Sequence, residues 1–133
     1  MLNVFNSVFT AIATTVRASV PGVTLTGERI AAPTKFPCVT VVEADNYEDP
    51  QYINNTLTEQ VTALMYEITV FSNLTSGKRS QCIEILQIID DVMKRKNGTR
   101  MARVEGYFDT EGKIYMVTAR YRMKTDGVNW YTF

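Results

Sequence analysis

Hydrophobic residues recur every three or four positions in two stretches of the chain, and each stretch predicts an amphipathic helix. The first helix is expected over residues 2–19, where Pro21 and Gly22 end it. Its apolar stripe consists of Met1, Phe5, Val8, Phe9, Ile12 and Val16. The second helix follows Ser76, whose hydroxyl is expected to cap it by accepting from backbone N–H groups. Its buried stripe consists of Cys82, Ile85, Leu86, Ile89, Val92 and Met93.

Charged residues mark the outer face and the end of the second helix. We interpret Asp90 and Asp91 as solvent-facing residues rather than a catalytic pair, since adjacent positions on a helix diverge. The cations of residues 94–96 fall in the last turn, where positive charge is favourable. Asn97 and Gly98 then supply a left-handed end to the helix.

Alternation of apolar and polar positions predicts the strands. They are expected over residues 23–26, 36–44, 59–73, 99–108 and 113–124. In the third strand one face is fully apolar and consists of Leu64, Tyr66, Ile68 and Val70. The opposite face is mixed, with Ala63, Met65, Glu67, Thr69 and Phe71. This mixed face is therefore expected to be partly solvated or to contact another chain.

The last two strands are expected to form a hairpin around residues 109–112. If Phe108 lies opposite Lys113, Val104 faces Val117 and Ala102 faces Ala119, which gives a consistent apolar face. The other face then collects Met101, Arg103, Glu105, Met116, Thr118, Arg120 and Arg122. A turn at Asp126-Gly127 leads into an aromatic tail over residues 130–133.

Residues 45–58 show no period and are rich in Asn, Asp and Pro, which predicts a long loop. A loop of this length in a compact domain is unusual, and is either a functional segment or a floppy hairpin tip. Its aromatic and aliphatic side chains argue against a fully disordered segment, in which such groups are rare. They favour a loop that packs against another surface. These side chains are Tyr47, Tyr52, Ile53 and Leu57.

The predicted order is α-β-β-β-α-β-β within a single domain over residues 1–133. Each helix has one apolar stripe, so both should pack on the same face of the sheet. The fold class is therefore a two-layer α+β domain with a mixed or mainly antiparallel sheet. If the third and fourth strands are parallel neighbours, the crossover between them should be right-handed.

The chain carries 14 basic and 14 acidic residues, a balance that argues against a generic nucleic-acid binder. Residues 1–70 hold three basic and seven acidic residues, and residues 71–133 hold eleven basic and seven acidic ones, so the halves carry −4 and +4. Either the asymmetry reflects solvated faces, or an acidic patch on one subunit meets a basic patch on the next.

Nothing in the sequence predicts catalysis or a bound metal. The chain has no histidine, and its two cysteines, Cys38 and Cys82, are expected to be reduced core thiols. Asp45, Glu48 and Asp49 cluster in a polar setting that offers no mechanism for raising a carboxyl pKa. We therefore expect neither an enzyme nor a cofactor. The N-terminal stretch lacks a basic region and is interrupted by polar residues, so it predicts neither a signal peptide nor a membrane span.

Eight cations near the end of the second helix and in the last hairpin could form one basic surface. They are Lys94, Arg95, Lys96, Arg100, Arg103, Arg120, Arg122 and Lys124. Such a surface would neutralise phosphates without reading sequence, for example in a pore lined by DNA. Alternatively, it is a solvated face with cations at a helix end.

Two segments carry a resemblance to a known family. They are Phe36-Pro37-Cys38-Val39 before a strand, and residues 65–73 (MYEITVFSN) before Ser76-Gly77-Lys78. Together they resemble the tail terminator, or tail-completion, proteins of long-tailed bacteriophages, best over residues 35–96. The resemblance implies a sheet backed by helices, a six-fold ring, and a position between the tail tube and the head connector. It carries no catalytic residues.

The function expected from this resemblance is a structural virion protein that caps the tail tube, ends its polymerisation and helps join tail to head. Its partners would be further copies in a hexameric ring, the major tail tube protein, the head connector protein and, without sequence preference, DNA in the ring lumen. It would lie in the virion tail, and in the host cytoplasm during assembly. A head-completion or connector protein and a small soluble binding module are the alternatives. The expected interface residues are Tyr47, Glu48, Asp49, Tyr52, Ile53, Leu57, Lys78, Arg79, Arg103, Arg120 and Arg122.

Overall fold

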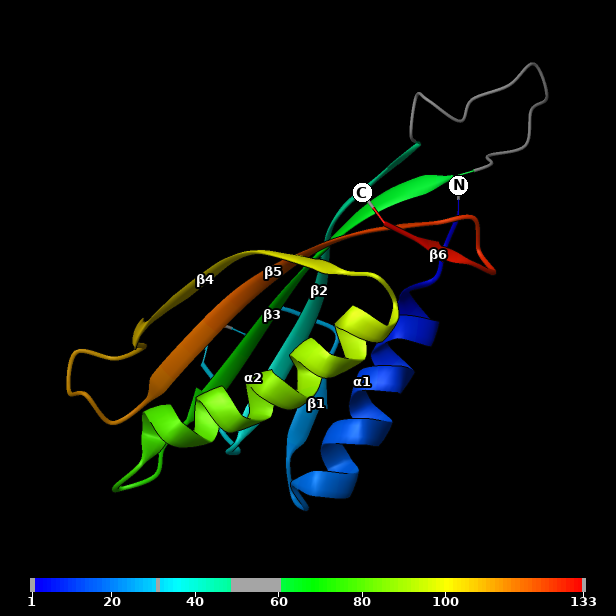
Figure 1. The fold of residues 1–133 in the computed structure, drawn as a ribbon. Coiled ribbons are helices and arrows are strands. Elements are labelled where there is room, and N and C mark those ends of the chain that lie inside the picture. The colour runs from blue at the N-terminus through cyan, green and yellow to red at the C-terminus, as the bar shows by residue number, and fades with distance from the viewer. Residues whose placement is uncertain (1, 31, 49–60, 133) are drawn as a thin grey trace.

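Two helices lie against one face of a six-stranded mixed sheet (Figure 1). The computed structural model describes residues 2–30, 32–48 and 61–132. In chain order the elements are α1 (Phe5–Ser19), β1 (Thr24–Thr26), β2 (Cys38–Glu48), β3 (Thr62–Ser72), α2 (Lys78–Arg95), β4 (Thr99–Tyr107), β5 (Tyr115–Thr125) and β6 (Trp130–Tyr131). This confirms the predicted α+β class and order, to which β6 is an addition.

The strands lie in the order β1-β2-β3-β5-β4, antiparallel except for the parallel pair β1 and β2. β6 pairs with β5 at Lys124 and Thr125, on the side of β5 not taken by β3. β3 and β4 run in the same direction, but β5 lies between them. The connection from β3 to β4 through α2 therefore passes over one strand, and these two strands are not neighbours. The predicted aromatic tail contains this short strand, β6.

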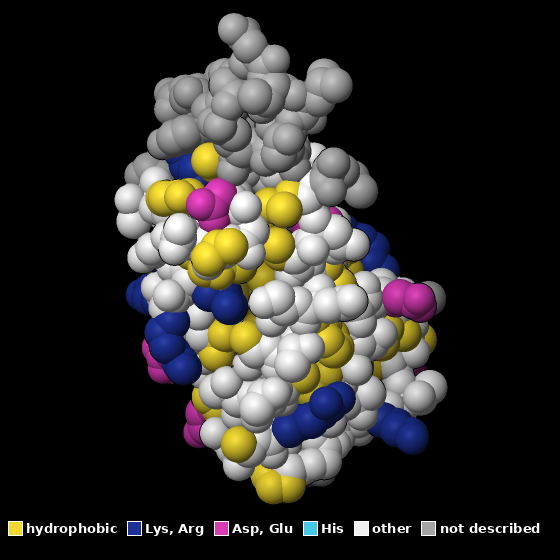
Figure 2. All heavy atoms as spheres, turned by 90° about the vertical axis from the view of Figure 1, so that its right-hand side faces the viewer, with side chains coloured by type: hydrophobic (Ala, Val, Ile, Leu, Met, Phe, Trp, Pro, Cys, Tyr) yellow, Lys and Arg dark blue, Asp and Glu magenta, His cyan; other side chains and the backbone are white. Residues whose placement is uncertain are grey.

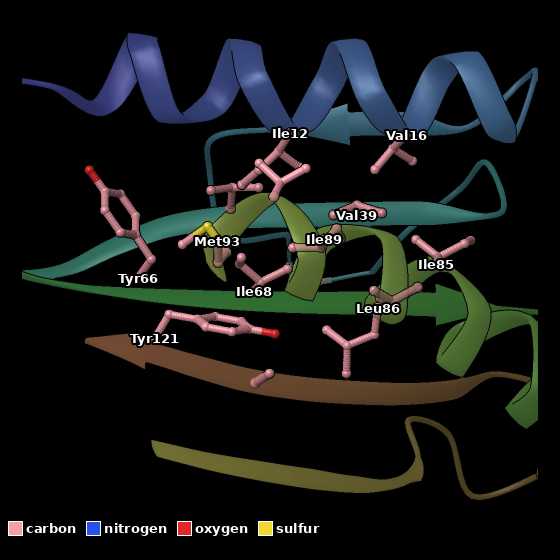
Figure 3. Close-up of a cluster of buried hydrophobic side chains, with 14 of the residues drawn as sticks. Ile12, Val16, Val39, Tyr66, Ile68, Ile85, Leu86, Ile89, Met93 and Tyr121 are labelled. Carbon is pink, nitrogen blue, oxygen red and sulfur yellow. The ribbon is translucent and has the colours of Figure 1, made fainter. Parts of the chain in front are cut away.

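The core lies between the helices and the sheet, as the apolar stripes predict (Figure 3). α1 contributes Ile12 and Val16, and α2 contributes Ile85 and Ile89, all of them almost completely buried. The sheet presents the predicted apolar face of β3 to these helices, and its four side chains are at most 1% exposed. Truncating one such side chain to alanine costs about 2–5 kcal/mol, so this layer carries much of the folding free energy.

The opposite face of the sheet, called here the open face, is partly covered. Thr69 and Thr118 share a hydrogen bond at 3.1 Å across β3 and β5. Phe71 packs edge-to-face against Phe108, with ring centroids 5.4 Å apart. These contacts account for the mixed side chains of β3, which are buried or half-buried rather than freely solvated.

β2 is longer than its pattern predicts, so the predicted loop over residues 45–58 is wrong for its first four residues. Asp45–Glu48 continue the strand and pair with Thr62–Met65 of β3. An irregularity at Ala44, where β2 holds one residue more than β3, hides this continuation from a simple alternation. The rest of the predicted loop, and residues 59–60 of the predicted third strand, lie outside the described residues. We call residues 45–48 and 62–65 the arm.

The predicted cap at Ser76 is wrong, because α2 begins one residue later. Gly77 occupies the N-cap position with φ of 83°, and no side chain caps the helix. A left-handed backbone at this point favours glycine. The end of α2 is as predicted in part: Asn97 has φ of 57°, and Gly98 donates its N–H to the carbonyl oxygen of Met93 at 2.8 Å.

The predicted register of the last hairpin holds at Thr99 and Arg100 but is wrong by one residue from Ala102 to Tyr107. Tyr107 lies opposite Tyr115, which places Val104 opposite Thr118 and Ala102 opposite Arg120. The cause is the turn, where Oδ1 of Asp109 accepts hydrogen bonds from the N–H groups of Lys113 and Ile114 at 2.9 and 3.1 Å. This lengthens the loop by one residue and moves the side chains from Ala102 to Tyr107 to the other face, until an irregularity at Met101 restores the predicted pairing.

Candidate functional site

The expected interface residues lie in three separate places. Tyr47 and Glu48 lie on the arm, whereas Arg79 and Arg103 meet Glu105 near the start of α2. Arg120 and Arg122 lie on the open face, since they pair with Glu67 and Met65. Four further expected residues, Asp49, Tyr52, Ile53 and Leu57, lie outside the described residues. The structure therefore does not bring the described candidates into one continuous site.

The arm directs its side chains to both faces of the sheet. Asp45 and Tyr47 lie opposite Met65 and Ala63, on the open face. Without the irregularity at Ala44, Asp45 would point toward the helices instead, which is the usual effect of a β-bulge. The Tyr47 side chain is 46% exposed, a large value for an aromatic residue. The arm therefore presents an acid and an aromatic ring together on its open-face side.

At the start of α2, the cations expected at the interface are already engaged. Nε of Arg79 donates to Oε1 of Glu105 at 2.7 Å, and the hydroxyl of Tyr115 donates to the same oxygen at 3.2 Å. The hydrogen bond from Arg79 is the main cause that holds the pKa of Glu105 below its ordinary value. Nη2 of Arg103 lies 3.8 Å from the same carboxylate. Lys78 borders a hollow of about 480 Å³ beside Leu74, and a second one together with Arg79.

On the open face, Glu67 joins two arginines. Its carboxylate accepts from Nη1 of Arg29 at 2.7 Å and from Nη2 of Arg120 at 3.0 Å. The hydrogen bond from Arg29 is the largest cause that lowers the pKa of Glu67 below its ordinary value. Because Arg120 is paired within its own subunit, a contact from another chain would have to compete with this pair.

The eight cations that could form one basic surface do not all lie on one face of the sheet. Arg120, Arg122 and Lys124 alternate along β5 on the open face, where Lys124 is buried. Arg100 and Arg103 instead lie opposite Tyr121 and Ala119, on the helix side. The one-residue shift moves Arg103 to the face opposite Arg120 and Arg122, and therefore removes the geometric argument for a continuous DNA-binding face.

The edge strand β4 is a feature that the sequence analysis did not find. Every residue from Thr99 to Glu105 is exposed, and β4 lies at the end of the strand order. Its exposed apolar side chains are Met101, Val104 and Tyr107, at 50%, 66% and 60%. An edge strand with such side chains is a site where another chain can add.

A second missed feature is a groove of about 790 Å³ between α1 and the end of α2. α1 lines it with Asn6, Ser7, Thr10, Ala11, Thr14 and Thr15. The other side consists of Val92, Arg95, Lys96 and Trp130. Lys96 Nζ lies 5.1 Å from the centre of the Trp130 ring. Figure 2 shows the side of the molecule where α1 lies, with charged side chains in small separate groups among polar and hydrophobic ones.

The composition of α1 is the sequence signal for this groove. Arg17 is the only charged residue among the 15 residues of α1, whereas α2 carries charges along its length. An exposed helix face is normally rich in charged residues. Small uncharged residues on such a face allow another backbone to approach closely.

The described carboxylates and thiols do not gather into a cluster of metal ligands. Asp45 faces the open side, whereas Glu48 pairs with Thr62 on the helix side, so these acids diverge. Among the described residues, no group of three or more His, Cys, Asp or Glu side chains could hold a metal ion. Cys38 and Cys82 are free and buried, which confirms the prediction of core thiols. Within the same residues, no helix is long and apolar enough to cross a membrane.

No model of a known protein family and no curated protein sequence matches this chain.

Proposed function

We propose that this chain is a structural subunit that forms a ring at the end of a bacteriophage tail. The ring caps the tail tube, ends its polymerisation and helps join the tail to the head. Its partners are further copies in a hexamer, the major tail tube protein and the head connector protein. In this proposal the protein lies in the virion tail after assembly in the host cytoplasm.

The observation that carries this proposal is the exposed edge of β4. Val104 and Tyr107 are more than half exposed on a strand that has one neighbour in the sheet. Exposed apolar side chains beside unpaired backbone groups favour pairing with another chain. The two-layer architecture is also the one that the resemblance to tail terminators implies.

The direct test is deletion of the gene from the phage or prophage that encodes it. A terminator is required to stop tube growth, so its loss should give tails of irregular, excessive length that do not join heads. Cryo-electron microscopy of complete particles should show a ring of this subunit between tube and connector. Tails of normal length without the protein, or finished particles that lack such a ring, would contradict the proposal.

The same images distinguish a head-completion protein. A ring that remains on heads purified without tails, and is absent from isolated tails, would assign the chain to the head side. A small binding module is the second candidate, and the groove between α1 and α2 favours it. In that case the gene deletion would leave tail length unchanged.

A further inference from the structure

The groove between α1 and α2 and the arm have complementary chemistry. Arg95 and Lys96 border the groove, and Lys96 lies over Trp130. Within the arm the charged side chains are Asp45 and Glu48, both acidic, and Asp45 is the one on the open face, across β3 from Arg122. Opposite charges on two surfaces orient an approaching partner and suppress wrong ones.

The two surfaces also lie on opposite sides of the subunit. Asp45 and Tyr47 point to the open face, because the irregularity at Ala44 turns them away from the helices. The groove lies between the two helices, which cover the other face of the sheet (Figure 1). A contact between two different surfaces of the same protein is head-to-tail, and closes into a ring when its rotation allows.

We infer that the groove receives the arm of a second copy of this chain, with Asp45 beside Arg95 and Lys96, and with Tyr47 between α1 and Trp130. This inference rests on the proposed ring function and names its subunit contact. The small side chains of α1, such as Thr10 and Ala11, leave room for the incoming tyrosine. Arg17 is the single charge on α1, so desolvating this face carries little electrostatic cost.

Charge and apolar burial have different parts in this contact. Ion pairs at an exposed rim contribute little to affinity, so Asp45 sets orientation more than strength. Burial of the Tyr47 ring against the Trp130 ring contributes more to the affinity. A single arm therefore binds weakly, and closure of a ring, in which each copy makes two such contacts, stabilises the assembly.

The first test is charge reversal. Asp45→Lys should weaken self-association about tenfold, because an attraction becomes a repulsion. Glu48→Lys is the matched control: it makes the same charge change on the same arm, on the helix-facing side. It should have a much smaller effect. Combining Asp45→Lys with Lys96→Glu should restore association. Sedimentation velocity measures the oligomer, and circular dichroism confirms that each variant is folded.

The second test is a crosslink. A Tyr47→Cys chain mixed with a Thr10→Cys chain should give a covalent dimer on mild oxidation, and each chain alone should stay monomeric under denaturing electrophoresis. Native Cys38 and Cys82 are buried, so they give no background. A Tyr47→Cys chain that crosslinks to itself would indicate a two-fold contact and overturn the inference.

The outcomes separate this inference from the proposed function. A ring on tails whose formation is insensitive to Asp45→Lys, and which gives no crosslink between positions 47 and 10, overturns the inference while the ring function stands. Absence of the ring from tails contradicts the function itself. If the purified chain stays monomeric at every soluble concentration, the crosslink is carried out on isolated tails. A crosslink there to a different protein also overturns the inference.

Discussion

The hydroxyl of Tyr121 on β5 donates a 2.8 Å hydrogen bond to Oδ1 of Asp90 on α2. The Asp90 side chain is only 4% exposed, and Arg100 and Lys94 also lie within 3.4 Å of its carboxylate. Burial is the main cause that raises the pKa of Tyr121, and the Asp90 carboxylate raises it further. This buried group joins the helix layer to the sheet.

Loss of the Asp90 carboxylate should therefore destabilise the fold. We expect Asp90→Ala to lower the free energy of unfolding by about 3 kcal/mol, because it leaves the buried Tyr121 hydroxyl without its acceptor. Tyr121→Phe should cost about 2 kcal/mol, and the double variant should cost less than the sum, because both changes remove one bond. Urea unfolding followed by circular dichroism measures each value.

The neighbouring acid is the control for this prediction. Asp91 is exposed, so Asp91→Ala should change the free energy of unfolding by less than about 0.5 kcal/mol. Equal effects of the two alanine substitutions would contradict a structural role for Asp90.

Asp90 also marks the limit of sequence reasoning for this fold. Helical periodicity correctly predicted that the two adjacent acids diverge, but the expectation that both face solvent is wrong for Asp90. Its partner Tyr121 is 31 residues away, so no local pattern indicates the pair. Apolar stripes predicted both helices and the buried face of β3, because burial depends on a period that is visible in the sequence. The hairpin register from Ala102 to Tyr107 depends on two hydrogen bonds to the side chain of Asp109, and was predicted wrongly.

In the candidate site, too, residue types could be predicted from the sequence, whereas the direction of side chains and the contacts between distant elements could not. Tyr47 was predicted from its residue type and is exposed on the arm. Its direction depends on the irregularity at Ala44, which alternation does not reveal. The groove combines residues of α1, α2 and the C-terminal region, so it exists only after folding. The low charge of α1 was visible in the sequence, but no prediction was drawn from it.

The two cysteines should be unreactive in the folded protein. Burial raises the pKa of the Cys38 thiol, and burial followed by the charge of Glu105 raises that of Cys82 to about 11. The thiolate is the reactive form, so alkylation by iodoacetamide at pH 8 should be slow at both positions. After denaturation both should react within minutes. Mass spectrometry counts the modified residues, and rapid alkylation of native Cys82 would contradict its burial.

The Asp126 carboxyl should titrate well below its ordinary range. Backbone N–H groups of Asn129 and Val128 donate to it, and these bonds lower its pKa to about 2. Because the pKa is lowered on folding, the ionised carboxylate stabilises the folded state at pH values above the ordinary pKa of 3.8. This contribution is lost as the pH falls through about 2. Carbon-detected NMR of the side chain measures the pKa. A midpoint near 3.8 would show that the turn does not hold these bonds in solution.

The exposed strand β4 predicts a substitution that separates folding from assembly. Val104 is 66% exposed, so Val104→Glu should change the free energy of unfolding by less than about 0.5 kcal/mol. If β4 contacts another chain, the same change should reduce incorporation of the subunit into tails, because it places an unpaired charge in an apolar contact. Val128→Glu is the matched control, since Val128 is 84% exposed and lies on the turn beside Asp126. Quantitative immunoblots of purified tails measure incorporation of each variant. Equal incorporation of Val104→Glu, Val128→Glu and the unchanged protein would exclude β4 from the assembly contact and remove the observation on which the proposed function rests.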